Sequence, residues 1–145
     1  MPTRSARTVW TGGLQDGSGQ TALVSSGLGT YDVSFPRRSA EAAEGYTSPE
    51  ELIAAAHASC YAMAFSNGLA KNGTPASKLS VKVAVTFDKT DAGWGIASSA
   101  ITVRGEVPGL DQAKFAELAE AAKEGCPVSK ALKGNVALSV DATLG

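Results

Sequence analysis

The hydrophobic positions of the first third of the chain fall in short runs of β-forming residues. Glycine-rich turn signals, Gly-Gly, Asp-Gly-Ser-Gly and Ser-Gly-Leu-Gly, separate these runs. Short runs between such turns are typical of a β-meander. The expected strands cover residues 7–11, 21–25 and 30–35.

A long helix is predicted next. Ser48 is suited to the N-cap, Pro49 to the first helical position, and Glu51 to the last position of a capping box. No Asp, Glu, Lys or Arg occurs in residues 52–70, so the helix is expected to be buried. A helix that is apolar around most of its circumference needs cover on several sides, which one small sheet cannot give. The pattern therefore also predicts a homodimer.

Strands and helices share the rest of the chain. Clear alternation in residues 80–89, followed by β-formers in 96–107, predicts a long hairpin. Further on we expect an amphipathic helix 111–125, a short helix 127–132 and a closing strand 136–144. The order βββ-α-ββ-αα-β defines an α+β protein.

Length and charge restrict the possible partners. A chain of 145 residues fits a single domain, 1–145, and its net charge of -1 lacks the basic footprint of a nucleic-acid binder. The N-terminus has no apolar signal segment, so we expect a cytoplasmic protein. Polar residues such as His57 and Asn67 interrupt the uncharged helix, which argues against a membrane span.

The chain has two cysteines, Cys60 and Cys126. In a reducing compartment such a pair suggests a transient disulfide, a metal site or two inert thiols. Cys126 follows Gly125 and precedes Pro127, so it lies next to a helix N-cap, where backbone amides favour a thiolate. Cys60 lies in mid-helix, where apolar surroundings raise the pKa of a thiol unless a cation approaches.

The candidate cations for Cys60 are Arg37 and Arg38, with Glu50 as the carboxylate that would accompany them. Glu50 and Cys60 are ten residues apart, so one helix separates them by about 15 Å. They cannot touch on the same helix. Two such helices packed antiparallel across a dimer axis would bring Glu50 of one subunit to Cys60 of the other.

His57 leaves other functions open, because it lies one helical turn before Cys60. The two residues could form the nucleophile pair of a thiol hydrolase, or bind zinc together with Cys126. A structural zinc site normally has four ligands in short-spaced pairs, so packing or a polar network is favoured for His57. A non-enzymatic dimeric carrier of a small apolar ligand is a further alternative.

Five aromatic residues are expected in the core or around an apolar pocket: Trp10, Tyr31, Tyr61, Phe65 and Trp94.

Two segments carry a family resemblance. Residues 47–60, Thr-Ser-Pro-Glu-Glu-Leu-Ile-Ala-Ala-Ala-His-Ala-Ser-Cys, and residues 125–132, Gly-Cys-Pro-Val-Ser-Lys-Ala-Leu, resemble the two signatures of the OsmC/Ohr thiol peroxidases. The segment 88–94, the Val-Pro-Gly-Leu before the second helix and the closing strand look more like the OsmC branch. The resemblance implies an intertwined α+β homodimer with antiparallel sheets around long buried helices. It also implies reduction of organic hydroperoxides, and less readily of hydrogen peroxide, with no metal and no bound cofactor.

The same resemblance implies the role of each site residue. Cys60 corresponds to the peroxidatic thiolate and Cys126 to the resolving thiol that closes a disulfide with it. Arg38, at the family spacing of Phe, two residues and Arg, corresponds to the arginine that stabilises the thiolate, in preference to Arg37. Glu50 corresponds to the glutamate that orients this arginine. Recycling by a dithiol reductant, of lipoyl type in the better known branch, is implied as well.

Overall fold

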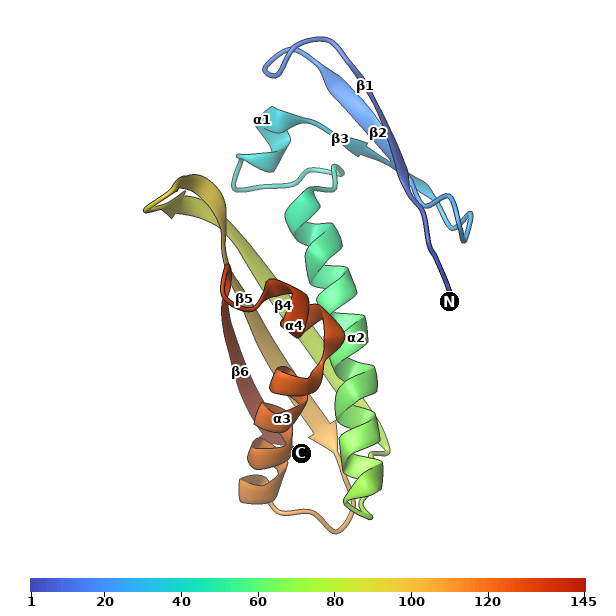
Figure 1. Ribbon diagram of the computed structural model, residues 1–145, viewed down its shortest axis with the longest axis vertical. Coiled ribbons are helices and arrows are strands. Elements are labelled where there is room, and N and C mark those ends of the chain that lie inside the picture. The colour runs from blue at the N-terminus through green and yellow to red at the C-terminus, as the bar shows by residue number, and fades with distance from the viewer. The chain divides into compact units, whose positions relative to one another are not determined.

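The computed structural model describes residues 1–145, and the chain divides into two compact units. We call Met1–Leu52 unit 1 and Ile53–Gly145 unit 2; the boundary falls within the long helix. Figure 1 shows the elements, which in chain order are β1 (Arg7–Thr11), β2 (Ser18–Ala22), β3 (Thr30–Val33), α1 (Phe35–Arg38), α2 (Pro49–Lys71), β4 (Lys78–Thr90), β5 (Gly93–Glu106), α3 (Gln112–Gly125), α4 (Pro127–Leu132) and β6 (Ala137–Leu144). The predicted α+β class is confirmed.

Unit 1 contains an antiparallel sheet in the order β1-β2-β3, as the meander pattern predicts. The first strand has the expected bounds, but the second lies at Ser18–Ala22 instead of 21–25. The carbonyl of Leu23 accepts from the amide of Gly27 at 2.9 Å, which closes a turn there. Because this bond takes Leu23 into the turn, the strand cannot continue to residue 25.

A short helix, α1, follows the third strand, which ends at Val33 instead of continuing to residue 35. The hydroxyl of Ser34 accepts a hydrogen bond from the amide of Arg37 at 3.2 Å, which makes Ser34 the N-cap. Pro36 is compatible with a first helical turn, because its missing amide has no partner to lose there. The helix ends with two consecutive arginines, Arg37 and Arg38.

The long helix α2 begins where the sequence predicts. The amide of Glu51 donates to the Ser48 hydroxyl at 3.1 Å, as in a capping box. The Glu51 carboxylate, however, accepts from the hydroxyl of Thr47. One face of the helix is completely buried through every fourth residue, His57, Tyr61, Phe65 and Leu69.

The opposite face of α2 is not covered within this chain, where Met63 is 70% exposed. The absence of charges predicts that α2 is buried on all sides. In a single copy of the chain only part of the helix is buried. No helix of the structure combines the length and the apolar character needed to cross a membrane.

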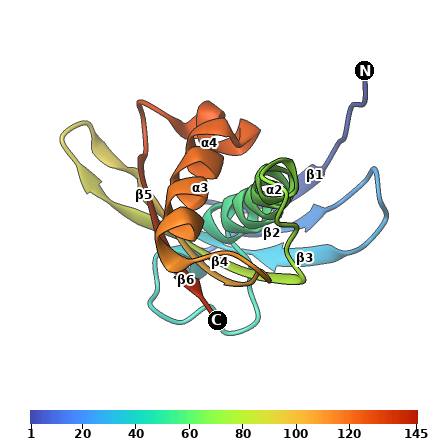
Figure 2. The same cartoon turned by 90° about the horizontal axis from the view of Figure 1, so that it is seen from below.

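Unit 2 contains a sheet in the order β4-β5-β6. The long β4–β5 hairpin is antiparallel, as predicted, but β6 runs parallel to β5. The expectation of purely antiparallel sheets is thus wrong for this sheet. A parallel neighbour needs a crossover connection, and α3 and α4 supply it between β5 and β6. In Figure 2, α3 lies beside α2.

The core of unit 2 forms where α2, α3 and β5 meet. Ile101 and Val103 project from alternate positions of β5 onto aromatic side chains of the helices. The rings of Phe65 and Phe115 lie 5.0 Å apart between centroids. Gly105 leaves room for this packing, because a Cβ there would lie 2.6 Å from the Phe115 ring.

The aromatic residues expected in the core divide into two groups. Tyr61 and Phe65 are fully buried in unit 2. Trp10, Tyr31 and Trp94 are exposed in this chain, by 40%, 39% and 68% respectively, so they are not core residues of a single copy, although Trp10 lines an apolar cavity, the other place expected for these aromatics. Trp10 and Tyr31 lie on short strands, and Trp94 lies next to the first residue of β5.

Candidate active site

Arg38 and Glu50 form a two-pronged ion pair in unit 1. The Arg38 Nε atom lies 3.0 and 3.2 Å from the two carboxylate oxygens of Glu50, and Nη2 lies 2.8 Å from Oε1. Glu50 is buried and the Arg38 side chain is mostly covered. Bidentate contacts of this kind fix the direction of a guanidinium as well as its position. The two neighbouring glutamates therefore have different roles. Glu51 takes part in capping the start of α2, and Glu50 forms the ion pair with Arg38.

Arg37 has a different partner. Its Nη1 atom lies 2.7 Å from the carboxylate of Glu44, and the two side chains are 38% and 60% exposed. Exposed ion pairs contribute little to stability and hold their groups loosely. Of the two candidate arginines, the structure joins only Arg38 to Glu50.

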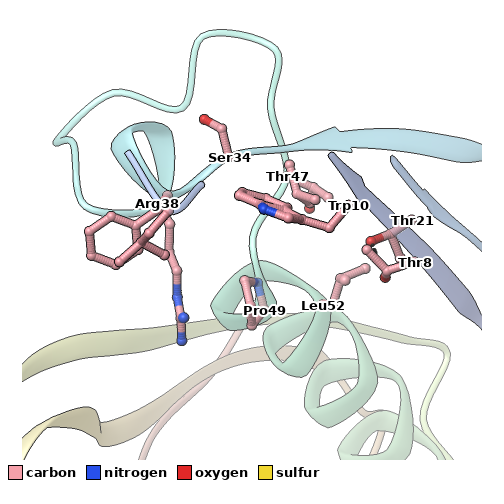
Figure 3. A pocket seen from close by; sticks show the side chains of 11 residues that line it. Thr8, Trp10, Thr21, Ser34, Arg38, Thr47, Pro49 and Leu52 are labelled. Carbon is pink, nitrogen blue, oxygen red and sulfur yellow. Dashed lines mark hydrogen bonds between the residues drawn. The ribbon is translucent and has the colours of Figure 1, made fainter. Parts of the chain in front are cut away.

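An apolar cavity adjoins Arg38 within unit 1. Its volume is about 350 Å³, and most of its lining is contributed by side chains of the meander and the first turn of α2. Figure 3 shows Trp10, Ser34 and Arg38 around it, together with Pro49 and Leu52. Cavities of this kind, apolar with a few polar groups, are typical of small-molecule sites.

The two thiols lie together in unit 2, although 66 positions separate Cys60 from Cys126. Both are free cysteines, and their side chains are hydrogen-bond partners. Cys60 is half-buried on α2, whereas Cys126, between α3 and α4, is fully buried. The structure therefore brings the two predicted cysteines to one place and gives them unequal access to solvent.

The pKa of Cys126 is lowered, in the predicted direction. Burial alone would raise this pKa, but hydrogen bonds from the Ser129 amide and from the Cys60 side chain favour the thiolate and outweigh burial. The Ser129 hydroxyl and the Val128 amide act in the same direction. Cys126 is the N-cap residue of α4 but makes no capping bond of ordinary geometry. The thiolate is thus favoured by side chains as well as by backbone, which the sequence did not indicate.

The pKa of Cys60 is raised, also as predicted. Burial is the main cause, and the neighbouring Cys126 adds to it both as a hydrogen-bond partner and as a charge. Only the Val128 amide acts in the opposite direction. Because the two sulfurs share one small space, a thiolate on one of them opposes a thiolate on the other.

His57 forms neither the Cys60 pair nor the zinc site considered from the sequence. Its Nδ1 atom lies 2.7 Å from the Ser99 hydroxyl oxygen and its Nε2 atom lies 2.8 Å from that of Ser129, so both ring nitrogens are occupied. All three side chains are buried, and burial lowers the pKa of His57. We call these three side chains the Ser–His–Ser network.

Sequence reasoning missed the two serines of this network. A signal for His57 was available, because it begins the series of every fourth residue that continues with Tyr61 and Phe65 and forms the buried face of α2. Ser129 follows Cys126 by three residues in a short helix, the spacing of side chains on one face. For Ser99 no such signal existed, since a single serine in a strand does not indicate a hydrogen-bond partner.

Comparison with known proteins now adds to this geometry. A family model described as OsmC-like protein matches residues 42–141 of the chain. The chain belongs to this family. It is also 38% identical over 135 residues to peroxiredoxin OsmC of Escherichia coli, which covers 93% of both proteins. Membership of the OsmC/Ohr family, predicted from the two cysteine segments, is confirmed.

Relatives from the Ohr branch are similar as well. The organic hydroperoxide resistance protein OhrB of Bacillus subtilis is 33% identical over 116 residues, which is 79% of this chain and 82% of that protein. Its crystal structure has a TM-score of 0.75 to this chain, at 28% identity, with 96% of this chain and 98% of that one covered. An OsmC structure from Legionella pneumophila has a TM-score of 0.71 at 26% identity, covering 99% and 98%. The OsmC-like fold is therefore established for this chain.

Proposed function

We propose that this protein is a cysteine-based peroxidase that reduces organic hydroperoxides, and less readily hydrogen peroxide, to an alcohol or water. The observation that carries the proposal is the contact between Cys60 and Cys126 inside a member of this family. The relatives are named a peroxiredoxin and an organic hydroperoxide resistance protein, which agrees with this chemistry.

Access decides which thiol reacts first. A peroxide can reach the half-buried Cys60, whereas Cys126 has no exposed surface in this chain. The Cys60 thiolate attacks one peroxide oxygen, the oxygen–oxygen bond breaks, and the alkoxide takes a proton to leave as alcohol. Cys60 is then a sulfenic acid. Cys126 attacks its sulfur, a disulfide forms, and water leaves. An external dithiol, such as that of a lipoyl protein, returns both thiols to the reduced state.

Cys60 needs a cation for the first step, because burial and Cys126 both raise its pKa. We assign this task to Arg38, oriented by Glu50, as the family resemblance implies. The two-pronged ion pair supports the assignment, because it fixes the direction in which the guanidinium points. The apolar cavity beside Arg38 is suited to the organic part of a hydroperoxide.

The active site is completed, in this proposal, by a homodimer in which each chain contributes one OsmC-like domain. An uncovered face of α2 and exposed apolar side chains in unit 1, among them Val9 and Leu14, support the pairing. We expect Met63→Glu, which adds a charge to that uncovered face, to shift the protein from dimer to monomer in sedimentation experiments. A wild-type protein that sediments as a monomer would contradict the homodimer.

Intact-mass analysis tests the chemistry directly. Reduced protein treated with one equivalent of cumene hydroperoxide should become lighter by two hydrogen atoms as the disulfide forms. In Cys126→Ser, Cys60 should instead gain an oxygen atom, and in Cys60→Ser the protein should not turn over. An unchanged wild-type mass would refute the peroxidase and direct attention to the carrier alternative. Full peroxidase activity in both cysteine variants would refute it as well.

A further inference from the structure

The Ser–His–Ser network is a buried polar feature that the proposed reaction does not yet use. Ser99 comes from β5, His57 from α2 and Ser129 from α4, so three separate elements are joined through one imidazole. None of the three side chains is more than 1% exposed. No buried side-chain nitrogen or oxygen lacks a partner. An arrangement that costs desolvation of an imidazole and two hydroxyls calls for a reason beyond packing.

The network ends beside the resolving thiol. Cys126 is the N-cap of the short helix α4 and Ser129 is the third residue of that helix, the two positions that approach each other at a helix start. The Ser129 side chain is a hydrogen-bond partner of the Cys126 side chain and lowers the pKa of that thiol. The hydroxyl is therefore placed between an imidazole nitrogen and a sulfur.

The number of hydrogens available determines which group donates in each hydrogen bond of the Ser–His–Ser network. A hydroxyl has one hydrogen, so if Ser129 donates it to Cys126, the oxygen must accept from His57 Nε2. A neutral imidazole carries one N–H, so Nδ1 is then an acceptor and receives the Ser99 hydroxyl hydrogen. Burial disfavours the charged imidazole, so the ring is neutral and only one of its nitrogens carries a hydrogen. The distal serine thus determines which way the hydroxyl nearest to Cys126 points.

We propose that the Ser–His–Ser network holds the Ser129 hydroxyl as a donor to the Cys126 sulfur and so prepares Cys126 to attack oxidised Cys60, an inference that rests on the function proposed above. In that step the sulfur–sulfur bond forms and the sulfur–oxygen bond of the Cys60 sulfenic acid breaks. The leaving hydroxide takes the proton that Cys126 has given up and departs as water. Cys126 sulfur is oxidised and the sulfenic sulfur is reduced. His57, Ser99 and Ser129 are positioning residues for this second step only.

The test separates the two steps of the reaction. Reduced protein is mixed with one equivalent of cumene hydroperoxide, and samples are quenched over time with dimedone, which traps the Cys60 sulfenic acid. In Ser129→Ala we expect Cys60 oxidation within about twofold of wild type but disulfide closure slower by roughly 10- to 100-fold, as for loss of a hydrogen bond to a charged group. His57→Phe should behave alike, and His57→Gln, which keeps an N–H, should recover part of the closure rate.

Tyr61→Phe is the matched control. It also removes one buried hydroxyl, which donates to the Ala119 carbonyl at 2.9 Å, but it leaves the Ser–His–Ser network intact. Closure at the wild-type rate is expected there even if the protein is less stable. If Ser129→Ala closes its disulfide as fast as Tyr61→Phe, the inference is wrong. If wild type forms no disulfide at all, the peroxidase proposal itself fails, so the two failures are distinct.

A second measurement needs no network variant. His57 is the single histidine of the chain, so the nitrogen NMR signals of its ring are uniquely assigned. In Cys60→Ser, which leaves Cys126 as the only thiol, we expect the neutral tautomer protonated at Nε2 once Cys126 is a thiolate. A tautomer protonated at Nδ1 would overturn the inference, because the Ser129 hydroxyl would then point toward His57 and away from sulfur.

Discussion

Unit 1 and unit 2 differ in what they bury. All fully buried apolar side chains belong to unit 2, from Tyr61 on α2 to Cys126. In unit 1 the buried side chains are those of Thr21 and Glu50, a hydroxyl and a carboxylate. Hydrophobic burial is the dominant favourable term in folding, so unit 2 carries most of the stability of a single chain. Unit 1 instead carries a charge in a fixed direction, through Arg38 and Glu50. Stability and charge placement are thus assigned to different parts of the sequence.

The strongest test of this division is Phe65→Ala in unit 2. Phe65 is fully buried and contacts the rings of Tyr61 and Phe115, so its loss should lower the free energy of unfolding by about 3–5 kcal/mol. Urea unfolding measures the change. The unit 1 counterpart is Leu28→Ala, where the side chain is 78% exposed and the expected cost is below about 0.5 kcal/mol. Equal losses of unfolding free energy in the two variants would contradict the conclusion that unit 2 carries most of the stability.

Arg38→Lys tests the other half of the comparison. A lysine cannot reproduce the bidentate contact with Glu50, so we expect peroxidase activity to fall roughly 10- to 100-fold while urea stability changes little. Arg37→Lys is the matched control, because Arg37 makes only an exposed pair with Glu44 and its activity should stay within about twofold. Kinetics with cumene hydroperoxide decide between them. Equal losses in both variants would remove Arg38 from its proposed role.

A smaller effect is expected in unit 2 on the pH at which each thiol ionises, because the pKa values of the two thiols are shifted in opposite directions. In Cys60→Ser, Cys126 should become a thiolate below the ordinary cysteine pKa of about 8.5, because Ser129 and Val128 still favour the anion. In the double variant Arg38→Ala and Cys126→Ser, which lacks the cation proposed for Cys60, Cys60 should deprotonate at higher pH than Cys126 does, since burial opposes its charge. Ultraviolet thiolate absorbance against pH measures both. The reverse order would contradict the assigned surroundings.

Local sequence signals predicted the elements well where one interaction decides the outcome. Ser48 and Pro49 placed the start of α2, and Pro127 placed the start of α4. The bounds of β2 were missed, because the turn at Leu23 depends on a bond to Gly29 that no short-range pattern shows. The parallel β5–β6 pairing was missed for a related reason: alternation identifies a strand but not the direction of its neighbour.

The candidate site shows the same limit. Cysteine chemistry and the choice of Arg38 over Arg37 followed from residue types and family spacing, and the Arg38–Glu50 contact agrees with that choice. The partners of His57 could not be predicted, because Ser99 and Ser129 are 42 and 72 positions away along the chain. Contacts over such separations arise from the packing of α2 against β5 and α4. That packing depends on the whole core of unit 2.

The contact between Cys60 and Cys126 has a consequence for chain entropy. A bond between these sulfurs would close a loop of more than sixty residues and remove many conformations from the unfolded chain. For a loop of this length the stabilisation is about 4 kcal/mol, comparable to the whole contribution of a large core side chain. The same two atoms that exchange electrons with a peroxide would therefore also set how much heat the protein withstands. Its resistance to unfolding would report its recent exposure to oxidant.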